Sequence, residues 1–337
     1  MRRGTPAGPR GAAAGPRPTE VRELTVVSTG GARLHTRIHG PDGAPTVVLV
    51  HGWTCQARFW NPVLRLLLPD HRVVVYDQRG HGRSPATPGS CCADALADDL
   101  CAVLAASVPA GERAVVGGHS MGAMSVVAAA GRPELAERAA AGLLCSTGVD
   151  RLDGESVVLP LRPGPWRGRA QRLLLRNPLP YGPVTPLFRR IVRHVTLGPG
   201  ADPALLLWTS RMVRDCPPGA RAEWGRVLAT LDLAERLPRL DLPVTVLHGS
   251  ADRLTPPVHA RRLAQRLPRC AGLIELQNLG HMTPLEDPAA VAEALRGLVR
   301  EHVGASAARA PTPAVGDGPG TQPVNPPVNQ PRDRQER

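Results

Sequence analysis

The segment GGHSMGAM, residues 117–124, places a serine between two glycines at the junction of two different patterns. The run RAVVGG before it is typical of a buried strand, and the run MGAMSVVAAA after it is typical of a helix. A residue at a sharp turn from strand to helix takes a strained backbone conformation, and its neighbours two positions away crowd each other. Gly118 and Gly122 relieve that crowding. The pattern therefore predicts that the hydroxyl of Ser120 is presented above the end of the strand.

The apolar runs along the chain predict an α/β fold. A hairpin is expected around Gly30 and Gly31, because an alternating run lies on either side of them. Continuous apolar runs then follow at 46–50, 72–77, 113–118, 140–146, 243–249 and 272–277. Helical stretches separate most of these runs, at 57–68, 92–107, 121–131, 257–267 and 288–302. Such alternation predicts a mostly parallel eight-stranded sheet with helices on both faces.

One long stretch interrupts this alternation. Residues 149–238 contain helical pieces and Pro- and Gly-rich turns but no convincing strand, so we expect a helical cap inserted after the sixth strand. The α/β core is then expected at 21–148 and 239–303. The two ends, 1–20 and 304–337, are rich in proline, glycine and polar residues. They are predicted to be disordered tails, because such a composition buries little apolar surface.

The net charge of the chain does not by itself exclude a class of function. The net charge is +12, and all 41 basic residues are arginine. The tails carry part of this charge, and we expect the rest to be spread along the chain without a basic stripe interleaved with aromatic residues. No dedicated nucleic-acid binding is therefore expected.

Cysteine spacing and hydropathy indicate which cellular location and which cofactors to expect. The seven cysteines show no C-x-x-C pair of a metal or redox site, which favours reduced thiols and a cytoplasmic location. No run approaches the roughly 20 apolar residues of a membrane span. No metal and no transmembrane segment are expected, and the sequence leaves the oligomeric state open.

Two polar residues follow late strands and match what a serine nucleophile needs. A serine hydroxyl requires a base, and the base requires a group that orients it. Asp252 follows the run at 243–249, and His281 follows the run at 272–277. The carboxyl ends of parallel strands meet at one edge of a sheet, so these side chains are expected to lie near Ser120. Asp150, just after the sixth strand, is the alternative acid.

Taken together, the motifs resemble those of the α/β-hydrolase family, and specifically of its serine esterase and lipase-like branch with a helical cap. The resemblance covers residues 21–303, outside the two tails. It rests on HGWT at 51–54, DQRGHGRS at 77–84, GHSMG at 118–122, GSADRLTP at 249–256 and GHMTPLEDP at 280–288.

The resemblance implies a role for several residues. Ser120 matches the nucleophile, Asp252 the acid and His281 the base. The backbone N–H groups of Trp53 and Met121 match the oxyanion hole. The family implies no cofactor, and DQRGHGRS is implied to be mainly a structural turn.

The resemblance predicts a hydrolase of carboxylic esters or thioesters acting on a small apolar substrate through an acyl-enzyme. Relatives that open epoxides or remove halogens use an aspartate where this chain has Ser120, so those reactions are disfavoured. Cleavage of C–C bonds and cofactor-free perhydrolysis or haloperoxidase-like chemistry remain alternatives on the same triad. A small-molecule receptor with little turnover is the alternative from another class.

A substrate pocket is expected where the cap covers the site. The helical stretch at 204–215 places Leu205, Trp208 and Met212 on one face, at spacings of three and four. This face and the Trp53 side chain are predicted to line an apolar pocket. The alternative is that the face only packs the cap onto the core.

Overall fold

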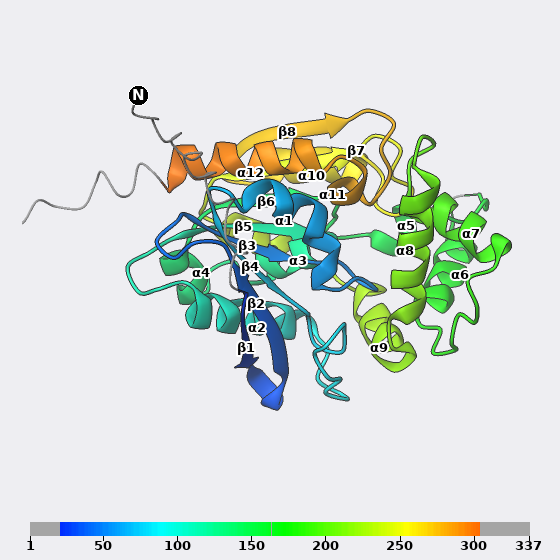
Figure 1. Cartoon of the computed structure of the whole chain (residues 1–337). Coiled ribbons are helices and arrows are strands. Elements are labelled where there is room, and N and C mark those ends of the chain that lie inside the picture. The colour runs from blue at the N-terminus through cyan, green and yellow to red at the C-terminus, as the bar shows by residue number, and fades with distance from the viewer. Residues whose placement is uncertain (1–20, 163, 304–337) are drawn as a thin grey trace, which may run out of the picture.

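The computed structural model describes residues 21–303 apart from Pro163. The predicted tails at 1–20 and 304–337 lie outside the described residues, so they stay predictions. Eight strands form one sheet in the order β1-β2-β4-β3-β5-β6-β7-β8 (Figure 1). The strands are β1 Arg22–Val27, β2 Arg33–His39, β3 Thr46–Val50, β4 Arg72–Tyr76, β5 Ala114–His119, β6 Ala139–Cys145, β7 Val244–Gly249 and β8 Cys270–Leu276.

The first two strands form the expected hairpin, and the others form the expected parallel sheet. β1 pairs antiparallel with β2, and β2 pairs antiparallel with β4. Every other pair in the sheet is parallel. The predicted fold, a mostly parallel eight-stranded sheet, is therefore confirmed.

The helices complete the fold. In the core they are α1 Asn61–Leu67, α2 Ala93–Ser107, α3 Met121–Ala128, α4 Pro133–Arg138, α10 Val258–Arg266, α11 Thr283–Glu286 and α12 Pro288–His302. Between β6 and β7 they are α5 Leu152–Glu155, α6 Pro165–Leu175, α7 Pro186–Thr196, α8 Pro203–Asp215 and α9 Pro218–Leu228. Short 3-10 helices are η1 Thr29–Gly31, η2 Ala57–Trp60 and η3 Ala234–Arg239.

Two apolar layers hold the helices onto the sheet. Along β3, Val48 and Val50 belong to a buried cluster with α2 and α3, whereas Val47 and Leu49 belong to a cluster with α1 and α12. Successive side chains of a strand point to opposite faces, so a strand buried on both faces has to be apolar throughout. This is why the uninterrupted run TVVLV forms a central strand.

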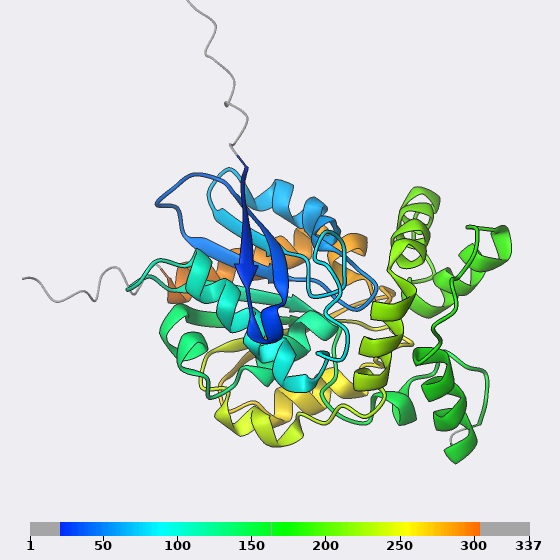
Figure 2. The same cartoon turned by 90° about the horizontal axis from the view of Figure 1, so that it is seen from below.

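The insertion between β6 and β7, which we call the cap, is helical as expected. Among its described residues there is no strand. Both views place the cap at one end of the sheet, with α8 and α9 nearer to the sheet than α6 and α7 (Figure 1, Figure 2). The domain boundaries at 149 and 238 stay predictions.

The sequence missed some local detail. The single helix expected at 57–68 is instead a 3-10 turn, η2, followed by α1. Helix α4 was not predicted. It is six residues long and begins with Pro133, too short to show a clear helical period in the sequence.

Candidate active site

Ser120 lies at a strained turn between β5 and α3. Its φ is 52° and its ψ is −117°, a combination that few residues other than glycine adopt. Its main-chain N–H donates to the carbonyl of Cys145 at 2.9 Å, and its own carbonyl accepts from the N–H of Ala123 at 2.9 Å. The turn is thus held by β6 on one side and by the first turn of α3 on the other. The strain predicted from the sequence is present at Ser120.

The two flanking glycines are required because a side chain at either position would overlap neighbouring backbone atoms. A Cβ on Gly122 would overlap the carbonyl oxygen of Val50, and one on Gly118 would overlap the backbone of Ala123. Helix α3 therefore packs directly on the end of β3. A third glycine brings the HGWT loop to the serine, since a Cβ on Gly52 would lie 3.1 Å from the Cβ of Ser120.

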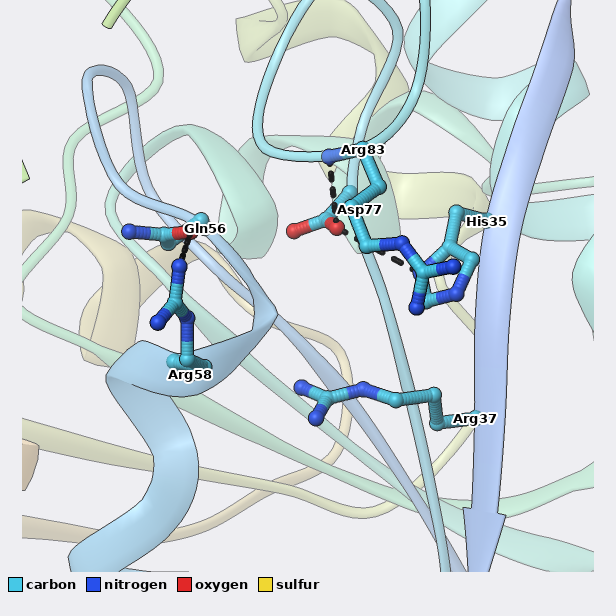
Figure 3. Close-up of a pocket in the computed structure, with 6 residues that line it drawn as sticks. All are labelled: His35, Arg37, Gln56, Arg58, Asp77 and Arg83. Atoms are coloured by element: carbon cyan, nitrogen blue, oxygen red, sulfur yellow. Dashed lines mark hydrogen bonds and ion pairs between the residues drawn. The ribbon is translucent and has the colours of Figure 1, made fainter. Parts of the chain in front are cut away.

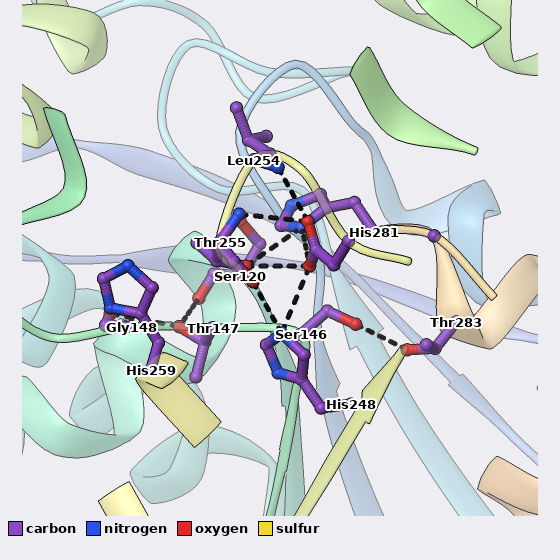
Figure 4. A network of polar contacts seen from close by, with 12 residues as sticks. Ser120, Ser146, Thr147, Gly148, His248, Leu254, Thr255, His259, His281 and Thr283 are labelled. Atoms are coloured by element: carbon purple, nitrogen blue, oxygen red, sulfur yellow. Dashed lines mark hydrogen bonds and ion pairs between the residues drawn. The ribbon is translucent and has the colours of Figure 1, made fainter. Parts of the chain in front are cut away.

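His281 lies beside this turn, in the loop after β8 (Figure 4), and Asp252 reaches it from the loop after β7. Nδ1 of His281 lies 2.8 Å from Oδ2 of Asp252, and both side chains are almost fully buried. The other carboxylate oxygen, Oδ1, accepts the N–H groups of Leu254 at 2.8 Å and Thr255 at 3.0 Å. The carboxylate is therefore fixed, and it orients the imidazole through Nδ1.

Two further side chains contact the same carboxylate, and the sequence analysis assigned no role to them at this site. The hydroxyl of Thr255 donates to Oδ2 of Asp252 at 2.9 Å, and Nε2 of His248 lies 3.4 Å from that oxygen. Burial on its own would raise the pKa of Asp252, but the charge of His281 and the contacts from His248 and His281 lower it below the ordinary value. Asp252 is thus kept ionised. The sequence signal for this loop was the motif ADRLTP, and it was interpreted only through its aspartate, Asp252.

The loop that carries His281 is tied to the cap. The N–H of His281 donates to the carbonyl of Thr196, the last residue of α7, at 2.9 Å. Glu286 joins the cap to the histidine loop, because its carboxylate accepts the N–H of Gly198 at 2.7 Å and that of Gly280 at 3.0 Å. A Cβ on Gly280 would overlap the backbone of Leu197. The cap and the histidine loop are therefore in direct contact.

His119, the residue before Ser120, contacts the main chain of His281. Its Nε2 donates to the carbonyl of His281 at 2.9 Å, and its ring stacks on Phe59. Burial, together with the neighbouring His281, lowers the pKa of His119 well below its usual value. The ring is therefore neutral. His119 thus packs and hydrogen-bonds within the core.

The predicted oxyanion donors belong to two segments that adjoin Ser120. Met121 begins α3, and Trp53 stands in the loop whose Gly52 adjoins the serine. In the described part of the chain, neither main-chain N–H donates a hydrogen bond. The indole of Trp53 donates to the carbonyl of Arg221 in the cap at 3.0 Å. The N–H groups are thus free, while the side chain of Trp53 bridges the core and α9.

The DQRGHGRS motif forms a structural turn, as expected. Oδ1 of Asp77 accepts the N–H of Ala57 at 2.6 Å, and Oδ2 accepts that of Arg83 at 3.0 Å. Arg79 forms a buried ion pair with Asp99. A hollow of about 210 Å³ opens beside Asp77, lined also by His35, Arg37, Gln56, Arg58 and Arg83 (Figure 3). Ser120 does not line this hollow.

Asp150, the alternative acid, is engaged elsewhere. Its carboxylate pairs with Arg262 at 2.8 Å and with Arg266 at 3.4 Å, both from α10. No contact joins it to His281 among the described residues. The geometry therefore favours Asp252 over Asp150.

The predicted pocket residues lie on the core-facing side of α8. Met212 is buried among residues that include Phe59 and Met282, and Leu205 and Trp208 pack against the same cluster. Trp208 and Met212 also line a hollow of about 180 Å³ with Gln56, Arg58, Arg211 and Asp215. Packing onto the core is thus present, and a role in the substrate pocket stays a prediction.

Neither a metal-binding cluster nor a membrane-spanning helix occurs among the described residues, 21–303 without Pro163. No group of three or more His, Cys, Asp or Glu side chains there could hold a metal ion. No helix there is long and apolar enough to cross a membrane. The seven cysteines all lie in this range, and their thiols are free.

The profile of the alpha/beta hydrolase family matches residues 47–294, from β3 into α12. The chain belongs to the alpha/beta hydrolase family. The family expected from the motifs is therefore confirmed, and the matched range includes Ser120, Asp252 and His281. Members of this fold place a nucleophile, an acid and a histidine base in this chain order. The chain is accordingly an enzyme of the hydrolase class.

Similar proteins agree with this assignment. A bifunctional esterase/perhydrolase from Acinetobacter calcoaceticus is 26% identical, covering 82% of this chain and 99% of that protein. A non-heme chloroperoxidase from Streptomyces lividans is 30% identical, covering 76% of this chain and 92% of that protein. The structure of an esterase from Thermogutta terrifontis aligns with a TM-score of 0.68 at 24% identity, covering 83% of this chain and 98% of that one. The last of these supports the fold of this hydrolase.

Proposed function

We propose that this alpha/beta hydrolase is a serine hydrolase of carboxylic esters, with Ser120 as nucleophile, His281 as base and Asp252 as acid. The observation that carries the proposal is the buried contact of 2.8 Å between Asp252 Oδ2 and His281 Nδ1, next to the strained serine. The carboxylate holds Nδ1 protonated, which leaves Nε2 as the basic nitrogen. In the described residues no hydrogen bond joins Nε2 to the serine hydroxyl. Such bonds are often long without substrate and shorten in the complex.

The first half of the reaction forms an acyl-enzyme. Oγ of Ser120 attacks the carbonyl carbon of the ester while its proton passes to Nε2 of His281. The oxyanion that develops accepts hydrogen bonds from the N–H groups of Trp53 and Met121. Loss of one such donor costs about 3 kcal/mol of transition-state stabilisation in other enzymes. The C–O bond then breaks, and the alcohol leaves with the proton from Nε2.

The second half releases the acid. A water molecule gives a proton to Nε2 of His281 and attacks the acyl carbon, and the same two N–H groups hold the second oxyanion. The bond to Oγ of Ser120 breaks, Oγ recovers the proton, and the carboxylic acid departs. No cofactor takes part in these steps. A thioester would follow the same course, with a thiol as the leaving group.

Perhydrolysis is the second candidate activity. It is favoured by the similarity to an enzyme described as both an esterase and a perhydrolase, and to a non-heme chloroperoxidase. In this chemistry hydrogen peroxide replaces water as the attacking group, and the acyl-enzyme yields a peracid. The same serine and histidine would serve both reactions.

One screen tests the proposal. Nitrophenyl esters of graded acyl length are compared with a thioester, with a ring-fission dienone and with acetate plus hydrogen peroxide. Sustained turnover of the esters is expected. A single burst without turnover would instead indicate a receptor, and turnover of the dienone alone would indicate a C–C hydrolase.

We also propose a cytoplasmic location and a small apolar ester as substrate. No dedicated nucleic-acid partner is expected. The apolar residues of α8 belong to, or pack against, one buried cluster on the core, and they support the proposal of an apolar substrate.

A further inference from the structure

One segment of the cap has an unusual charge. Residues 156–201 contain eight arginines and no aspartate or glutamate, although the whole chain has 29 acidic residues. The positive charge was expected to be spread along the chain, and this segment carries a large share of it. The arginines are Arg162, Arg167, Arg169, Arg172, Arg176, Arg189, Arg190 and Arg193.

Most of this charge faces solvent without a carboxylate partner. Five of the eight arginines are exposed, namely Arg162, Arg169, Arg176, Arg190 and Arg193. None of these five forms an ion pair with a carboxylate in the described residues. Arg169 lies over the ring of Trp166, with 5.0 Å between the guanidinium carbon and the ring centre. A surface with unpaired cations attracts an anionic partner.

The same segment exposes large apolar side chains. It holds eight of the fourteen such side chains that are exposed in the described residues. They are Val157, Leu161, Trp166, Leu173, Leu174, Leu179, Leu187 and Ile191. Trp166 and Leu173, both on α6, are each 75% exposed, and Leu187 on α7 is 67% exposed. Scattered single residues of this kind need no explanation, whereas a contiguous exposed apolar patch marks an interaction site.

Helices α6 and α7 lie at the outer end of the cap. Both views place them at the end of the molecule away from the sheet (Figure 1, Figure 2). α6 packs on α5 and α9, α7 packs on α8, and both helices leave large side chains exposed to solvent. We call the exposed arginine and apolar residues of 157–193 the cap outer face.

The mixture of side chains identifies the partner. Exposed leucine, isoleucine and tryptophan bind acyl chains, and arginine binds phosphate headgroups, so this composition is that of a surface lying in a bilayer interface. A single-stranded nucleic acid would call for several stacking aromatics, whereas Trp166 is the only exposed large aromatic side chain in the described residues. We propose that the cap outer face docks onto the surface of an anionic lipid bilayer. This docking is independent of the chemistry at Ser120.

Vesicle binding by the full chain tests the proposal. We expect co-sedimentation with phosphatidylcholine vesicles that contain about 30% phosphatidylglycerol, weaker binding to pure phosphatidylcholine, and weaker binding at high salt. The triple variant Arg169→Gln/Arg176→Gln/Arg190→Gln should bind about a hundredfold more weakly, since each arginine near such a surface contributes roughly fivefold. All three are exposed, so the melting temperature should change little.

A matched triple variant removes the same charge elsewhere. Arg22, Arg33 and Arg65 are exposed and have no carboxylate partner in the described residues, and they lie on β1, β2 and α1. Their replacement by glutamine should leave vesicle binding within about twofold of the wild type. Equal loss in both triple variants would overturn the proposal, because net charge alone would then account for binding.

The apolar part of the face has its own test. Leu173→Ser/Leu187→Ser keeps every charge and should lower vesicle binding by about tenfold or more. Brominated lipid should quench tryptophan emission in the wild type, and Trp166→Phe should remove most of that quenching. Wild-type protein that binds heparin but not the anionic vesicles, or that shows no quenching, would overturn docking and indicate a soluble polyanion as the partner.

Discussion

The carboxylate of Asp252 lies 2.8 Å from Nδ1 of His281, and the hydroxyl of Thr255 and the imidazole of His248 contact the same carboxylate oxygen. The oxygen therefore lies within reach of three neighbouring side chains. Such a site keeps the histidine in one tautomer and in one orientation.

We expect Asp252→Asn to lower kcat for a nitrophenyl ester by about 10⁴-fold with the fold intact, because the amide would favour the wrong tautomer. Asp150→Asn is the matched control, since it removes a buried carboxylate that pairs with Arg262 and Arg266 instead. It should change stability but not kcat. The reverse pattern in the two variants would assign the acid to Asp150.

Ser120→Ala should abolish labelling by a fluorophosphonate probe and lower kcat by about 10⁴- to 10⁶-fold, because the attacking oxygen is gone. Ser125→Ala serves as the control, since this serine is buried in the same helix but bonds to Gln78 and to the carbonyl of Met121. Ser125→Ala should label as the wild type does. Stoichiometric labelling of Ser120→Ala, read by mass spectrometry, would contradict the assignment.

Gly122→Ala should destabilise the protein by about 3 kcal/mol or more, because the new methyl would overlap the carbonyl of Val50. Gly219→Ala offers a comparison within α9, where a Cβ would meet nothing within 4 Å. It should be neutral, or stabilising by about 0.5–1 kcal/mol. Urea unfolding at neutral pH measures both changes, and similar values for the two would refute the packing argument.

Stability should fall with acid because of buried neutral histidines. Burial lowers the pKa of His81 to about 3, and it shifts the pKa of His51 and His119 in the same direction. On unfolding, such a histidine regains an ordinary pKa of about 6.5. Between these two values the unfolded state binds a proton that the folded state does not, so unfolding becomes more favourable as pH falls below about 6.5.

For each such histidine the free energy of unfolding should decrease by about 1 kcal/mol per pH unit in that window. Urea unfolding at several pH values between about 7 and 5 measures the slope. His81→Gln should flatten it even if stability is lower throughout, whereas the exposed His194→Gln should not. An unchanged slope in His81→Gln would show that this histidine carries no such linkage.

The selectivity of the enzyme is expected to depend on α8. Each methylene that enters an apolar pocket contributes up to about 0.8 kcal/mol, so kcat/KM should rise by well over tenfold from acetyl to hexanoyl esters. Trp208→Ala should weaken this dependence and leave acetyl esters nearly unaffected. Leu206→Ala on the same helix is a packing control. If chain length has no effect in the wild type, Trp208 only packs the cap onto the core.

The sequence by itself determined the elements and the candidate nucleophile. The runs at 46–50 and 72–77 are uninterrupted apolar stretches, and β3 and β4 form there, because a strand buried on both faces must be apolar at every position. Gly118 and Gly122 around Ser120 are equally local signals, since the space for a tight turn depends on residues two positions away. The hydrophobic pattern of a strand and the glycines of a tight turn depend only on residues close in the chain, so the sequence shows them directly.

Only the tertiary structure decided between distant partners. Asp150 and Asp252 both follow a strand. Asp150 forms ion pairs with two arginines of α10, whereas Asp252, in the loop after β7, contacts His281. The contact of His248 with Asp252 and the bridge from Glu286 to the cap were likewise invisible in the sequence. These contacts depend on the order of strands in the sheet and on which helix covers them. Such distances are set by the packing of the whole fold, and no local period encodes them.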